Sequence, residues 1–106
     1  MKTAILIGDS IRMGYQAHVE TALDGIAHVW GPDANGGDSG KVREHLSQWL
    51  ETGRRDGVHL NCGLHDIKKA FDSNRAQVDE SAYRENLIHI FETVLATGTP
   101  LVWATT

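Results

Sequence analysis

The sequence predicts an α/β domain built on a parallel sheet, and two observations lead to this prediction. Short apolar runs that suit buried strands alternate with segments in which apolar residues recur at helical spacing. This alternation continues through all 106 residues, without a repeat, a linker or a low-complexity stretch. Strands alternating with helices are typical of a parallel sheet with helices on both faces. We therefore expect residues 1–106 to form a single domain.

The first half of the chain supplies two strands and one helix. Residues 4–7 are four apolar residues, two of them β-branched, and such a short run favours a buried strand. A helix is expected over about 10–24, ended by Asp24 and Gly25. Residues 26–30 read as the second strand, which Gly31 and Pro32 close.

The second half repeats this pattern after an irregular loop at 31–40 that is rich in Gly, Asp and Asn. A second helix, capped by Asp38 or Ser39, is expected to run to about residue 52. Its predicted apolar stripe consists of Val42, Leu46, Trp49 and Leu50. The remaining predicted elements are a strand at 58–62, a polar loop at 63–79 with one helical turn near 68–71, a helix at 81–97 and a strand at 101–104.

Composition and charge exclude several classes of function. A net charge of −4 gives no basic footprint for nucleic acid or for an anionic membrane. Cys62 is the only cysteine, so no disulfide within the chain is expected. The apolar run at the N-terminus is too short for a signal peptide, which predicts a cytoplasmic protein. Neither a dinucleotide-binding or phosphate-binding glycine motif nor a tight spacing of metal ligands is present, so we expect no cofactor and no metal.

Three polar segments follow successive strands and should meet at one edge of the sheet. They are Gly8-Asp9-Ser10, the loop at 35–39 and Gly63-Leu64-His65-Asp66. In a parallel sheet, ligands bind at the carboxyl ends of the strands. A serine between a central strand and a helix has its N–H in the positive field of the helix N-terminus, which suits a nucleophile. On this stretch alone, the alternative is that Asp9 and Ser10 merely cap a helix.

In this order, the three segments resemble the motifs of the SGNH (GDSL-type) hydrolases, which cleave esters with a serine nucleophile. Gly8-Asp9-Ser10-Ile11 corresponds to the family's Gly-Asp-Ser-Leu, Gly37 to the glycine after the second strand, and residues 63–66 to Gly-x-Asn-Asp. The resemblance implies that Ser10 is the nucleophile and that the backbone N–H groups of Ser10 and Gly37 bind the oxyanion. It also implies a flavodoxin-like, three-layer α/β/α fold with a parallel sheet, for which we expect the strand order 2-1-3-4.

The chain departs from this family at the third motif, where His65 replaces the asparagine. A neutral imidazole N–H can also donate a hydrogen bond to an oxyanion, so we interpret His65 as a substitute donor. The alternatives are a packing or loop-stabilising role, or service as the general base. Asp9 and Asp66, which flank these residues, are expected to support the site.

The second departure is the family's late Asp-x-x-His, which the sequence does not reach before Thr106. The run from Asp56 to His59 matches this spacing, but it lies at the amino end of a strand, whereas Ser10 follows a carboxyl end. Four other histidines are expected on surfaces away from the site: His18, His28, His45 and His89. We therefore expect a C-terminally truncated domain that lacks the fifth strand and the acid–base pair.

Two hypotheses for the function follow from these patterns. The first is a serine esterase acting on small acyl or acetyl esters, with little activity in this segment alone. The second is a non-catalytic flavodoxin-like module that acts in binding or assembly. The apolar fourth strand would form an edge of the sheet, and such a bare edge is a hazard for self-association.

Overall fold

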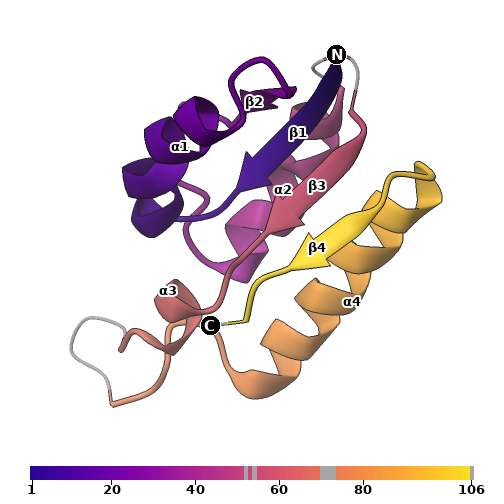
Figure 1. Ribbon diagram of the computed structural model, residues 1–106. Helices are drawn as coiled ribbons and strands as arrows, with labels where there is room; N and C mark the ends of the chain where they lie inside the picture. The colour runs from indigo at the N-terminus through magenta and orange to yellow at the C-terminus, as the bar shows by residue number, and fades with distance from the viewer. Residues whose placement is uncertain (52, 54, 70–73, 106) are drawn as a thin grey trace.

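The structure is a computed structural model that describes residues 1–51, 53, 55–69 and 74–105. These residues form four strands and four helices (Figure 1). They are β1 (Lys2–Ile7), α1 (Ser10–Ala22), β2 (Ala27–Trp30), α2 (Ser39–Leu50), β3 (Gly57–Leu60), α3 (Leu64–Ile67), α4 (Glu80–Ala96) and β4 (Leu101–Trp103).

The strands form one parallel sheet in the order β2-β1-β3-β4, which confirms the predicted topology. Helix α1 lies on one face of the sheet, and α2 and α4 lie side by side on the other, so the fold has three layers (Figure 1). Because every connection returns the chain to a parallel strand, the segments that follow β1, β2 and β3 reach the same edge. The α/β, flavodoxin-like character of the prediction is therefore confirmed.

The hydrophobic core lies between the sheet and the pair of helices α2 and α4. Alternate residues of β1 and β3, such as Ile7 and Leu60, point into it and are fully buried. All four residues of the apolar stripe predicted for α2 are buried there. The half-buried Trp103 of β4 joins the core through an edge-on contact with Phe91 of α4, their ring centroids 5.3 Å apart.

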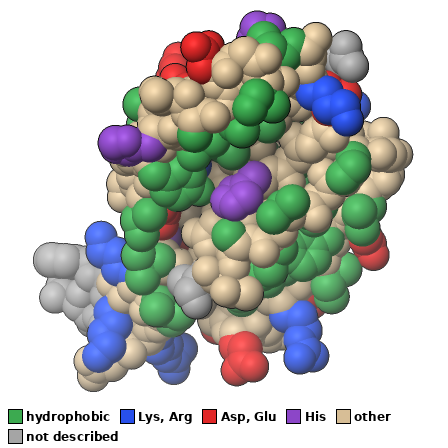
Figure 2. All heavy atoms as spheres, in the orientation of Figure 1, with side chains coloured by type: hydrophobic (Ala, Val, Ile, Leu, Met, Phe, Trp, Pro, Cys, Tyr) green, Lys and Arg blue, Asp and Glu red, His purple; other side chains and the backbone are tan. Residues whose placement is uncertain are grey.

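The opposite face of the sheet is covered only in part. Leu6, His59 and Val102 are neighbours across β1, β3 and β4, and their side chains share this face. Leu6 is buried, whereas Val102 is 58% exposed, because α1 packs against β1 and β2. Figure 2 shows a histidine among hydrophobic side chains over the middle of the sheet. No helix in the described part of the chain has the length and hydrophobicity required to cross a membrane.

The helical turn after β3 differs from the prediction. It is formed by Leu64–Ile67, and Lys68, where the predicted turn begins, has an extended backbone with φ −61° and ψ 132°. Gly63, with a φ of 148°, reverses the chain directly after the strand, and its carbonyl accepts a hydrogen bond from the Ile67 N–H. Of the predicted turn at 68–71, residues 70 and 71 lie outside the described residues.

The other element boundaries lie within two residues of their predicted positions. Asp38, one of the two expected caps, is the N-cap of α2, because its Oδ1 accepts the Lys41 N–H at 2.9 Å. Ser39 is instead fully buried as the first residue of the helix.

Candidate active site

Ser10 is the first residue of α1 and follows the central strand β1 after a two-residue turn, Gly8-Asp9. Asp9, which is only 2% exposed, caps the helix by accepting the Ile11 N–H on Oδ1 at 2.9 Å. The Ser10 side chain is exposed, and no hydrogen-bond partner for its hydroxyl is found among the described residues. The buried cap fixes the turn below the serine and leaves the hydroxyl accessible.

The loop that carries Gly37 lies directly against this turn. The N–H of Gly36 donates a hydrogen bond of 2.9 Å to the carbonyl of Gly8. A Cβ at position 36 would lie 2.7 Å from the same carbonyl oxygen, so only glycine permits this approach. The loop after β2 is thereby held beside the loop after β1.

The N–H of Gly37 already has an acceptor in this structure. It donates to Oδ1 of Asn35 at 2.8 Å, while Gly37 itself adopts a positive φ of 66°. A side chain two residues before the amide is a common partner in such loops. A substrate oxyanion that uses this N–H must therefore displace the Asn35 side chain.

His65 approaches the same turn from α3. Its Nε2 lies 4.0 Å from Oδ2 of Asp9, and its side chain is one third exposed. This distance is too long for a hydrogen bond, but the two groups attract each other when the imidazole is protonated. The three segments that contain Ser10, Gly37 and His65 thus meet at one edge of the sheet.

Asp66, the residue after His65, binds the start of α2. Its Oδ1 accepts the Ser39 N–H at 2.9 Å, and its Oδ2 accepts the Ser39 hydroxyl at 2.5 Å. The amide of Asn86 in α4 donates to the Ser39 hydroxyl oxygen at 3.0 Å. Because the positive end of a helix dipole favours a carboxylate, this buried acid is well placed at the N-terminus of α2. Asp66 thereby links the third segment to the loop that carries Gly37.

Several hollows open near this edge of the sheet, among them a smaller one beside α1 and a larger one beside α4. The smaller, of about 360 Å³, adjoins the start of α1 and of α3 and is mainly apolar. It is lined by Ile11, Arg12, Tyr15, Asn61, Leu64, Ala104 and Thr105. Because Ile11 follows Ser10 and Leu64 precedes His65, this hollow lies next to the candidate site.

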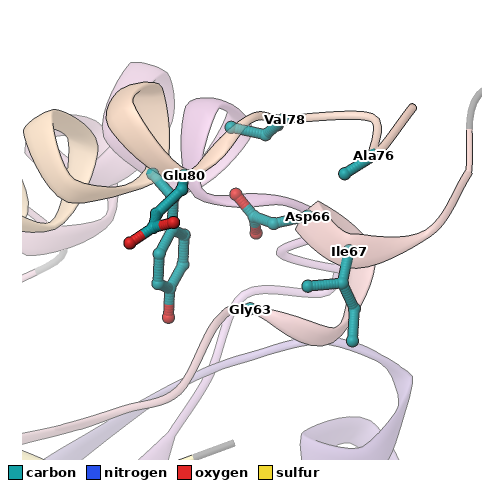
Figure 3. A pocket seen from close by; sticks show the side chains of 7 residues that line it. Gly63, Asp66, Ile67, Ala76, Val78 and Glu80 are labelled. Carbon is teal, nitrogen blue, oxygen red and sulfur yellow. The ribbon is translucent and has the colours of Figure 1, made fainter.

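The larger hollow, of about 500 Å³, lies between α3 and the start of α4. It is lined by Gly63, Asp66, Ile67, Ala76, Val78, Glu80 and Tyr83. Figure 3 shows the Asp66 carboxylate among these residues, with Glu80 on one side and Ile67 on the other. Ser10 does not line it, so we do not assign it to the reaction.

The remaining histidines occupy other surroundings. The side chains of His18, His28 and His89 are exposed, and the ring of His45 lies against that of Trp49. His59 meets Tyr15 edge-on at 6.5 Å, and Asp56 accepts the Thr3 N–H at the amino end of β1, the edge opposite Ser10. Within the described ranges, no three metal-binding side chains are grouped to hold an ion.

Sequence patterns did not reveal the roles of Arg12 and Ser39. Arg12 is 3% exposed although it is charged, and Ser39 is fully buried. The only signal for Arg12 is a charged residue in the first helical turn after a glycine motif.

No protein-family model and no curated protein matches this chain.

Proposed function

We propose that this chain carries the nucleophile of an SGNH-type serine hydrolase that acts on small acyl or acetyl esters. The observation that carries the proposal is Ser10, an exposed serine at the carboxyl end of the central strand and at the N-terminus of α1. Its oxygen would bond to the ester carbonyl carbon, and the ester C–O bond would then break. The serine proton would pass through a base to the departing alcohol, and water would hydrolyse the acyl-serine.

Three donors are available for the negative charge that develops on the carbonyl oxygen. The Ser10 N–H lies at the helix N-terminus, and the Gly37 N–H, in the loop that Gly36 joins to Gly8, would become available once Asn35 gives way. The third donor is the imidazole of His65, whose Nε2 lies 4.0 Å from Oδ2 of Asp9 in the turn. Removal of one such donor typically lowers turnover by a factor on the order of 10²–10³.

Among the described residues, no activating base is bonded to Ser10 in the candidate site. No side chain in the described ranges accepts a hydrogen bond from the Ser10 hydroxyl, and an un-ionised serine is a weak nucleophile. We propose that a histidine and an aspartate outside this sequence supply that role, as the resemblance implies. Serine hydrolases that have lost their triad partners still accelerate hydrolysis roughly 10³–10⁴-fold over water, and this residual catalysis comes from the oxyanion donors and from binding.

Hydrolysis of p-nitrophenyl acetate tests this proposal with two chains and their Ser10→Ala variants. We expect the 106-residue chain to work barely above background, and a longer chain with an Asp-x-x-His to work readily. Ser10→Ala should abolish the gain in the longer chain, and His65→Ala should lower its rate on the order of 10²-fold. A longer chain that keeps its rate after Ser10→Ala would refute the proposal.

The missing base also favours a second candidate, a binding module that keeps the pocket without catalysis. In that case, the longer chain and its Ser10→Ala variant would hydrolyse the ester at the same low rate. The same assay therefore separates the two functions.

A further inference from the structure

Arg12 brings a positive charge into the interior next to the candidate site. It is the third residue of α1 and only 3% exposed. Burial lowers the pKa of Arg12, and Tyr15, Asp33 and Asp9 act in the opposite direction. Removing a guanidinium from water is costly unless its N–H groups find acceptors, so the contacts of this side chain matter.

Two glycines leave the space that the Arg12 side chain occupies. A Cβ at Gly8 would lie 2.7 Å from the Arg12 Cβ, and a Cβ at Gly31 would lie 2.9 Å from its Nη1. Gly8 belongs to the turn before Ser10, and Gly31 begins the loop that contains Gly37. The Arg12 side chain therefore lies between these two segments. A residue larger than glycine at either position would collide with it.

The guanidinium connects α1 to this loop. Nη2 donates to the carbonyl of Ala34 at 2.8 Å, and Nη1 donates to Oε1 of Gln16, on the same helix, at 2.7 Å. Ala34 precedes Gly37 by three residues, and Gly36 between them donates to the Gly8 carbonyl. Arg12 thus ties the loop to the helix whose first residue is Ser10.

We propose that Arg12 is a positioning residue that fixes the loop at 31–38 so that the Gly37 N–H lies beside Ser10. Arg12 acts through Ala34 and needs no contact with substrate. The catalytic consequence rests on the proposed function, whereas the ordering of the loop does not. At the other end of the loop, Asp66 holds Ser39, so the segment is fixed at both ends.

Amide hydrogen exchange, measured by NMR on the full chain, tests this role without an activity assay. Arg12→Met keeps the length and volume of the side chain and removes both hydrogen bonds. We expect amide exchange at Gly36 and Gly37 to become about tenfold faster or more, because the loss of a hydrogen bond to a charged group typically changes an equilibrium by at least this factor. Exchange at Val58, whose N–H donates to Pro100 in the sheet, should change less than about twofold.

Arg43→Met is the matched control, because Arg43 is exposed and donates only to Asn86 among the described residues. It should leave the exchange at Gly36 and Gly37 unchanged. If Arg12→Met does not fold, Arg12→Lys decides, since it keeps the charge but not the forked geometry and should still accelerate exchange at both glycines.

Unchanged exchange at Gly36 and Gly37, or an equal acceleration at Val58, would overturn the proposal. In the longer chain, Arg12→Met should also lower kcat for p-nitrophenyl acetate about tenfold, with KM nearly unchanged. If Ser10 proves not to be the nucleophile, the exchange measurement still decides whether Arg12 orders the loop.

Discussion

Asp66 is a single residue that joins three elements of the fold. Both of its carboxylate oxygens bind Ser39 at the start of α2, and Asn86 of α4 reaches the same hydroxyl. Asp66 and Ser39 are both buried, so water cannot replace these bonds. The adjacent His65 faces Asp9 instead. Two successive residues of α3 therefore contact different elements, His65 the turn before α1 and Asp66 the start of α2.

Replacing Asp66 by alanine should be strongly destabilising. Asp66→Ala leaves the buried N–H and O–H of Ser39 without acceptors and should lower the free energy of unfolding by about 3 kcal/mol. Asp66→Asn keeps one acceptor oxygen and should cost about 1 kcal/mol. Urea denaturation measures both effects. Asp38→Ala, which removes the exposed cap of the same helix, is the control at about 1 kcal/mol. Equal losses for Asp66→Ala and Asp38→Ala would contradict this role.

At the scale of elements, local patterns predicted the long helices and the strands. The apolar stripe of α2 and the short run before Gly8 are set by residues close in sequence, so periodicity alone identifies them. Helix α3 has only four residues, fewer than a periodic pattern needs. Its start depends on the backbone of Gly63, which the sequence does not reveal.

The candidate site was predictable as far as its strand ends. Ser10, Gly37 and His65 each follow a strand, and parallel topology brings such segments to one edge. The bond between Asn35 and Gly37 and the burial of Arg12 were not predictable. The burial of the Arg12 side chain depends on the space left by Gly31, which is distant in sequence. Without such a space, a charged residue on a helix is expected to lie in water.

At the scale of the whole molecule, one face of the sheet is fully packed and the other only partly. The core against α2 and α4 contains Cys62, which lies two residues after β3 and is 1% exposed. Burial raises the pKa of Cys62 from 9.0 to about 12, and Asp66, Asp38 and Asp9 act in the same direction. Burial also raises the pKa of Tyr15 above its ordinary value of 10.0.

These shifts predict a loss of stability in alkaline solution. Both groups are protonated in the folded state and ionise more easily when the chain is unfolded. Their contribution to the free energy of unfolding is therefore complete below pH 9 and declines as the pH rises toward 12. The free energy of unfolding should fall by up to about 1.4 kcal/mol per pH unit for each group. Urea denaturation between about pH 8 and pH 10 measures this slope, which Cys62→Ala should reduce. Identical slopes for the two proteins would contradict the assignment to Cys62.

The central claim is that Ser10 is the nucleophile, and the position of an acetyl group tests it most directly. The longer chain with an Asp-x-x-His is incubated with excess p-nitrophenyl acetate and stopped with acid during turnover, and acetylated serines are then located by peptide mass spectrometry. Ser81 is an internal control, because it is also exposed in the first turn of a helix capped by aspartate. We predict acetylation of Ser10 well above that of Ser81, since the proposed oxyanion donors belong to the site around Ser10. Equal acetylation of the two serines would contradict the claim.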